Sequence, residues 1–271
     1  MMPAIAMRIV RLCRDSDINA NQLEKIIMSD QAFAGQLLQT ANSALYRRAV
    51  SISSIQSAIV RVGLRHVKNL AIGLSANALH KLPTPRAQKL WQDSRTIASA
   101  AQIVGWWYGM PEDAYVVGLL HNVGMTILNN LDTERFEHCI NLASEQRALE
   151  ETQQEFFGVN HIEIGAALLK KWSLDQPFVD AIAAQAAPWN FPGTTDKGNT
   201  LATCIHASKV FMELPIFKSM GAEELSQSER LELEEELLDT PVIQHLKMSA
   251  NQLSETITKL EKVFIQDSSD S

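Results

Sequence analysis

The chain has 271 residues, of which 46% are hydrophobic, and its net charge is −7. This length and apolar content are enough to fill a sizeable core without crosslinks. The cysteines Cys13, Cys139 and Cys204 are widely separated and lack the CxxC spacing of a zinc or redox site. No basic N-terminal segment leads into an apolar run, and no run approaches the about 18 residues that a membrane span requires. We expect a soluble, cytoplasmic protein with reduced thiols and no membrane partner.

Charge is distributed unevenly along the chain. Residues 1–70 contain nine Lys/Arg and four Asp/Glu, whereas residues 222–240 contain eight Asp/Glu and one Arg. The acidic total argues against general nucleic-acid binding. We expect the acidic stretch 232–238 to be a solvated helix. The alternative is attraction to the basic N-terminal part, within the chain or between subunits.

Apolar residues recur at helical spacing almost throughout, and no segment alternates as a strand does. The first helix is expected over 3–14. Residues that favour N-cap positions predict the starts of three further helices; they are Asn19, Asp30, and Ser53 or Ser54. Gly63 is expected to interrupt the helix before the run 64–82. Together these helices form a predicted N-terminal lobe, residues 1–82.

The two prolines of Pro83-Thr84-Pro85 cannot continue a helix and mark the predicted lobe boundary. A second lobe is expected over 86–212, with a loop at 188–198. Its predicted helices are 86–108, 112–131, 133–150, 161–172, 176–186 and 199–212. An acidic helical extension, 213–271, follows. The fold class is therefore all-α, a two-lobed helical bundle with a short C-terminal helical extension.

Three motifs carry a family resemblance. SDQA at 29–32 leads into LLQTANSALY at 37–46, SSIQSAIVRVGLR occupies 53–65, and GLLHNVG occupies 118–124. In combination they resemble the HDOD domains of bacterial signalling proteins, and GLLHNVG is similar to the HD motif of the related metal-dependent phosphohydrolases. The resemblance covers about residues 1–210. It implies an HD-like helical fold and a place in signal transduction beside receiver or cyclic-dinucleotide domains.

The resemblance also assigns positions of a metal site, and most of them have changed. Asn122 stands where the superfamily has an aspartate, and a carboxamide offers a cation one neutral oxygen. Asp93 replaces a histidine, Gln185 and Ala186 replace a histidine pair, and Lys209 replaces an aspartate. A lysine cation opposes metal binding. His121 and His161 are kept. We therefore expect no cofactor, with one weak metal on His121, His161 and Asp93 as the open alternative.

Several residues have two interpretations. His121 and His161 fit hydrogen-bonded core positions better than ligands, and Asn42 and Ser43 fit a helix end better than a partner contact. Arg61, Arg65 and Lys68 recur at i, i+4 and i+7, which predicts a stripe that is solvated or binds a partner. The aromatic runs 106–108 and 189–191 favour packing over base stacking.

These observations favour a non-catalytic signalling module that acts through protein–protein interaction, with other signalling proteins as partners and homodimerisation as an option. The first alternative is a degenerate HD-type phosphohydrolase using His121, Asn122, His161 and Asp93 around one metal. The second is a nucleotide or RNA sensor in which Arg61, Arg65 and Lys68 bind phosphates.

Overall fold

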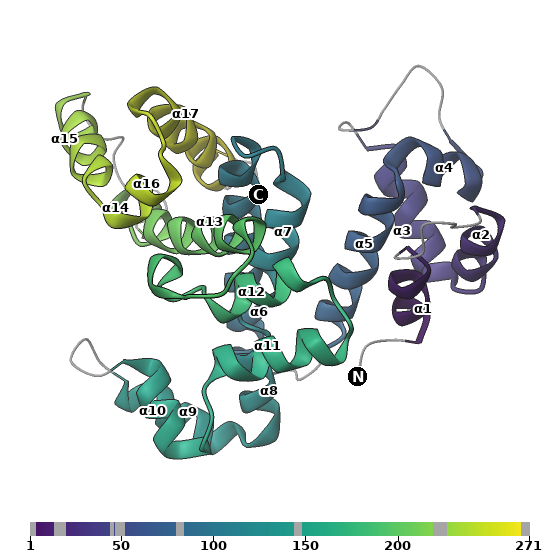
Figure 1. Cartoon of the computed structure of the whole chain (residues 1–271), viewed down its shortest axis with the longest axis horizontal. Coiled ribbons are helices and arrows are strands. Elements are labelled where there is room, and N and C mark those ends of the chain that lie inside the picture. Colours follow the sequence, from purple (N-terminus) through teal and green to yellow (C-terminus); the bar gives the residue numbers. More distant parts are fainter. Residues whose placement is uncertain are drawn as a thin grey trace. The chain divides into compact units, whose positions relative to one another are not determined.

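The computed structural model describes residues 4–13, 20–43, 46, 52–79, 84–143, 148–218 and 227–266. Every regular element within these ranges is a helix, which confirms the all-α prediction (Figure 1). The chain folds into two compact units, Met1–Pro83 with Lys171–Leu174, and Thr84–Lys170 with Asp175–Ser271. The predicted extension 213–271 therefore belongs to the second unit. Across the described ranges, no helix is both long and apolar enough to cross a bilayer.

Within its described residues, the first unit contains five helices, α1 (Ala4–Leu12), α2 (Ala20–Met28), α3 (Gln31–Ala41), α4 (Ile55–Val62) and α5 (Leu64–Asn77). Local capping explains two of the starts. The Asp30 carboxylate accepts the Phe33 N–H at 3.0 Å, and the Ser54 hydroxyl accepts the Ser57 N–H at 3.2 Å. The predicted cap Asn19 lies outside the described residues. At the end of α3, Asn42 bonds both backbone groups of Ile52, so its role is structural.

Gly63 separates α4 from α5 and changes one prediction. Its backbone has φ 84° and ψ 157°, a conformation that glycine adopts without steric cost. Arg61 therefore lies on α4, whereas Arg65 and Lys68 lie on α5. The prediction of one continuous helical stripe for these three cations is wrong, because helical spacing does not extend across the break.

The second unit begins with α6 (Pro85–Trp106), where the Thr84 hydroxyl caps the Ala87 N–H at 3.1 Å and Pro85 takes the first turn. The elements that follow are α7 (Pro111–Leu120), α8 (Val123–Leu131), α9 (Thr133–Leu142), α10 (Leu149–Phe157), α11 (His161–Lys171), α12 (Gln176–Ala183), a 3₁₀ turn (Pro188–Asn190) and α13 (Asp196–Met212). Helix α7 packs along α6, and α13 packs against α6, α7 and α12. The core of this unit thus surrounds α13.

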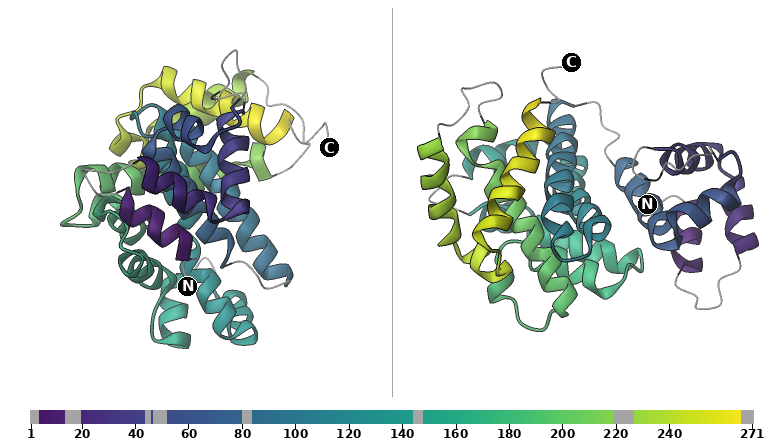
Figure 2. Two further views of the ribbon diagram at one scale, coloured as in Figure 1. Left: turned by 90° about the vertical axis from the view of Figure 1, so that its right-hand side faces the viewer. Right: turned by 90° about the horizontal axis from the view of Figure 1, so that it is seen from above.

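The C-terminal helices are α14 (Pro215–Lys218), α15 (Gln227–Leu238), α16 (Pro241–Leu246) and α17 (Ala250–Glu261), followed by a π turn (Lys262–Gln266). Figure 2 shows α17 alongside α6, and the two helices pack against each other. Trp107 Nε1 donates to Thr256 Oγ1 at 2.9 Å, and the Tyr108 hydroxyl donates to the Leu246 carbonyl at 2.8 Å. The aromatic run 106–108 therefore attaches these helices to the end of α6.

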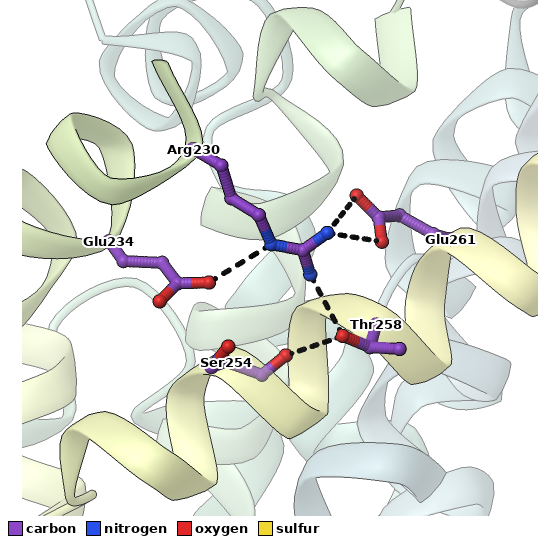
Figure 3. Close-up of polar contacts among 5 residues, drawn as sticks. All are labelled: Arg230, Glu234, Ser254, Thr258 and Glu261. Carbon is purple, nitrogen blue, oxygen red and sulfur yellow. Dashed lines mark hydrogen bonds and ion pairs between the residues drawn. The ribbon is translucent and has the colours of Figure 1, made fainter. Parts of the chain in front are cut away.

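Arg230 joins α15 to α17 (Figure 3). Its Nη1 lies 3.1 Å from a carboxylate oxygen of Glu261, and its Nη2 donates to Thr258 Oγ1 at 2.8 Å. Its Nε bonds Glu234, one turn along α15, at 3.2 Å. Charge-assisted bonds from one planar guanidinium fix the two helices more firmly than isolated surface pairs do.

Candidate functional site

The HD-like motif lies at a break between two helices. A continuous helix over 112–131 was the prediction, but α7 ends at Leu120 and α8 begins at Val123. Asn122 leaves helical geometry, with φ −100° and ψ 10°. The glycines of the motif explain the packing on either side. A Cβ at Gly118 would lie 2.7 Å from the Ala98 Cα on α6, and a Cβ at Gly124 would overlap the His161 carbonyl. The close approach at Gly124 brings the start of α11 to this turn.

His121 is buried, with 3% of its surface exposed. Its Nδ1 lies 2.6 Å from the Gly118 carbonyl oxygen. A carbonyl only accepts, so Nδ1 carries the proton. The pKa of His121 is well below its ordinary value, chiefly because of burial and then because of the nearby Lys209 ammonium. The ring is therefore neutral, with a lone pair on Nε2.

His161 opens α11 and has the same protonation. Its backbone N–H and its Nδ1–H both donate to Gln153 Oε1, at 2.9 and 2.7 Å. Burial, followed by the Lys209 charge, lowers the pKa of His161 to about 3. Gln153 is fully buried on α10 and was not identified from the sequence. The sequence feature that could have identified it is its i, i+4 spacing from the apolar Leu149, which places both residues on one face of the helix.

A chain of hydrogen bonds connects Lys209 through Gln185 to the backbone of His121. Lys209 Nζ donates to Gln185 Oε1 at 2.9 Å, and Gln185 Nε2 donates to the His121 carbonyl at 3.1 Å. His206 Nδ1 donates to the Gln185 carbonyl at 3.2 Å. Burial lowers the pKa of Lys209 to about 8, against a smaller opposing effect of Glu150. We refer to His121, His161, Gln185 and Lys209 as the histidine–lysine cluster.

The other three predicted site residues, Asp93, Asn122 and Ala186, take no part in the hydrogen bonds given above. Burial raises the pKa of Asp93, and the charges that act on it are Lys89 and Arg86, on its own helix. The Asn122 side chain makes no capping hydrogen bond at the start of α8. Ala186 is exposed. The hydrogen bonds and charge interactions of the cluster thus link four of the seven predicted positions, His121, His161, Gln185 and Lys209.

The residues present do not fit a catalytic metal. Among the described residues, no three or more His, Cys, Asp or Glu side chains are grouped closely enough to hold an ion. The cluster itself offers two imidazoles, an amide and an ammonium. Mg²⁺ and Ca²⁺ take oxygen ligands, chiefly carboxylates, and a catalytic Zn²⁺ takes three protein ligands, whereas the cluster has two imidazoles and an ammonium that repels a cation. The arrangement is suited to polar bonding between helix ends.

Comparison with known proteins gives a family. The HDOD domain model matches residues 1–188. A crystal structure of an HDOD domain protein of unknown function from Geobacter sulfurreducens is similar, with a TM-score of 0.73 at 24% identity, and the match covers 100% of this chain and 92% of that one. A candidate phosphohydrolase from Shewanella amazonensis SB2B has a TM-score of 0.71 at 19% identity, with coverage of 96% and 90%.

An uncharacterized protein of Treponema pallidum (strain Nichols) is 26% identical over 185 residues, which are 67% of this chain. The chain spans 36% of the length of that relative. The two structural likenesses, both under 25% identity, concern the fold alone. The family model is broader evidence, because it matches more than half of the sequence and includes the motifs at 29–65 and 118–124. The chain therefore belongs to the HDOD domain family.

Proposed function

We propose that the chain is a non-catalytic signal-transduction module that acts by binding other proteins, and that the histidine–lysine cluster serves its fold. The observation that carries the proposal is the position of Lys209. Its ammonium bonds Gln185 and lowers the pKa of both histidines. A positive charge thus lies where a hydrolase would need negative charge to hold a metal.

The cluster has a structural use that accounts for its polar groups. Gln185 is fully buried, and both ends of its amide and its carbonyl are bonded. These bonds connect the α7–α8 turn, the chain after α12, and α13. Unpaired buried groups each cost about 1–3 kcal/mol, so the network stabilises this junction by satisfying them. The signalling part of the proposal rests on the family, and location in the cytoplasm stays a prediction.

The first experiment measures metal and turnover on the full chain. Elemental analysis for Mn, Fe, Ni, Zn and Mg is combined with assays of cyclic dinucleotide and nucleotide hydrolysis, for wild type and His121→Ala. We expect substoichiometric metal and equal background rates in the two proteins. Stoichiometric metal with turnover abolished in His121→Ala would overturn the proposal in favour of the degenerate phosphohydrolase.

A second experiment restores a carboxylate to the site. In Lys209→Asp, the cluster gains a ligand of the missing type, and added Mn²⁺ or Zn²⁺ should raise the melting temperature because it binds the folded state. Lys170→Asp, an exposed position on α11, makes the same charge change outside the cluster. We expect a metal-dependent shift only in Lys209→Asp. An equal shift in the wild type would contradict the role given to Lys209.

The partner half of the proposal needs a separate test. Affinity purification of the tagged full chain from its source cell should recover a signalling protein in stoichiometric amount. A purified pair should then rebind in vitro. Failure of the purified pair to associate would refute the proposed interaction, whatever the metal content.

A further inference from the structure

A groove between α14 and α15 in the second unit combines an apolar floor with an acidic rim. Its volume is about 240 Å³. We refer to its apolar lining residues, Pro215, Ile216 and Leu233, as the floor and to its acidic ones, Glu229, Glu232 and Glu236, as the rim. The three glutamates recur at i, i+3 and i+7, so they lie along one face of α15. Such a groove suits a basic helix that places an apolar side chain on the floor.

The chain itself carries the complementary charge. Residues 84–271 contain 27 Asp/Glu and 14 Lys/Arg, whereas residues 1–83 contain ten Lys/Arg and four Asp/Glu. The two parts thus have opposite net charges of substantial size. A second copy of the chain brings a basic surface at the same concentration as the acidic groove, and complementary potentials favour such encounters.

Helix α1 fits the groove in both charge and spacing. It buries Ala6, Ile9 and Val10 in its own unit. Arg8 and Arg11 are exposed and one turn apart, with the half-buried Met7 beside them. The two arginines lie one helical turn apart, as Glu232 and Glu236 do on α15. Two helices packed side by side can therefore pair these charges while Met7 faces the apolar floor.

We propose that the groove between α14 and α15 binds α1 of a second copy. Exchange of this contact in both directions gives a closed two-fold dimer with two identical interfaces. The proposal is independent of the histidine–lysine cluster, so it can fail while the proposed function stands. Exposed ion pairs are screened by salt, and we therefore expect the dimer to weaken as ionic strength rises.

Sedimentation equilibrium of the full chain over a range of concentration and salt measures the association. Glu232→Lys with Glu236→Lys reverses the rim. Since each dimer contains the contact twice, the dissociation constant should rise by about 10-fold or more. The matched control is Glu151→Lys with Glu155→Lys, an exposed pair with the same i, i+4 spacing on α10. It should leave the constant within about 3-fold of the wild type.

A charge swap identifies the partner helix. Arg8→Glu with Arg11→Glu should weaken the dimer alone, and should restore association when combined with the reversed rim. Circular dichroism and thermal melting of each variant exclude unfolding as the cause. The proposal is overturned by a monomer at all concentrations at low salt, by equal weakening in the α10 control, or by a swap that restores nothing.

Discussion

Replacement of Lys209 by Met tests whether a buried ammonium lies in the histidine–lysine cluster. The pKa of this amine falls from 10.5 to about 8 in the folded chain, mainly because burial disfavours the charged form. Each pKa unit corresponds to about 1.4 kcal/mol. The charged lysine therefore costs the folded state about 3 kcal/mol at neutral pH, relative to the unfolded chain.

At pH 7, the loss of a hydrogen bond in Lys209→Met offsets the removal of the buried charge, so the free energy of unfolding should change little. Methionine fills the space but leaves Gln185 Oε1 without its donor, which costs about 1–3 kcal/mol. The pH dependence separates the two effects. Since the folded-state pKa lies below the unfolded one, the unfolded chain holds more protons between pH 8 and 10.5. The wild type should gain stability as pH rises through this window, and Lys209→Met should not.

Urea unfolding of both proteins at intervals from about pH 7 to pH 10 measures this difference. We expect the free energy of unfolding of the wild type to rise by about 2–3 kcal/mol relative to Lys209→Met. Lys170→Met, at an exposed position, serves as the control and should follow the wild type. Parallel curves for wild type and Lys209→Met would refute the assignment of a buried ammonium.

Three further predictions concern packing and acid stability. Gly124→Ala places a Cβ against the His161 carbonyl and should lower the free energy of unfolding by about 2–4 kcal/mol. Gly35→Ala, where a Cβ meets nothing within 4 Å, should raise it by about 0.5–1 kcal/mol. Urea titrations of both variants and the wild type measure these changes. The pKa of His161 is about 3 in the folded chain against 6.5 ordinarily, so the unfolded chain takes up more protons below pH 6.5. The free energy of unfolding of the wild type should therefore fall by about 2 kcal/mol by about pH 5, and that of His161→Gln should not show this fall. An identical acid slope in both proteins would contradict this. Arg230→Ala should cost about 1–2 kcal/mol and speed amide exchange in α15, and unchanged exchange there would show that the guanidinium does not hold this helix.

The helix starts could be predicted because their causes are local. Asp30 and Ser54 each accept an N–H three residues ahead, an interaction that needs no other part of the fold, whereas the Thr84 cap was not among the predictions. The break after Leu120 could not be predicted in this way. It accompanies the packing of Gly118 on α6 and of Gly124 on α11, neighbours that are distant in sequence or across a turn.

The site was predicted as a set of positions but not as a network. The family resemblance marked Gln185 and Lys209 as lost ligands, and the structure gives them bonds of their own. The Gln185–His121 bond spans 64 residues, and sequence spacing contains no signal for such a contact. Asp93, the position that replaces a histidine, takes no part in these bonds, and the charges that act on it come from Lys89 and Arg86 on its own helix.

Helix α13 has a consequence for experiments that divide the chain. The family match ends at residue 188, before this helix begins at Asp196. Yet α13 buries Leu201, Cys204, Ile205 and Phe211 among α6, α7 and α12, and it supplies Lys209. A fragment cut at the family boundary would expose the apolar faces that α13 covers. The smallest autonomously folding fragment is therefore longer than the segment by which the family is recognised, and expression of the domain should retain the chain through α17.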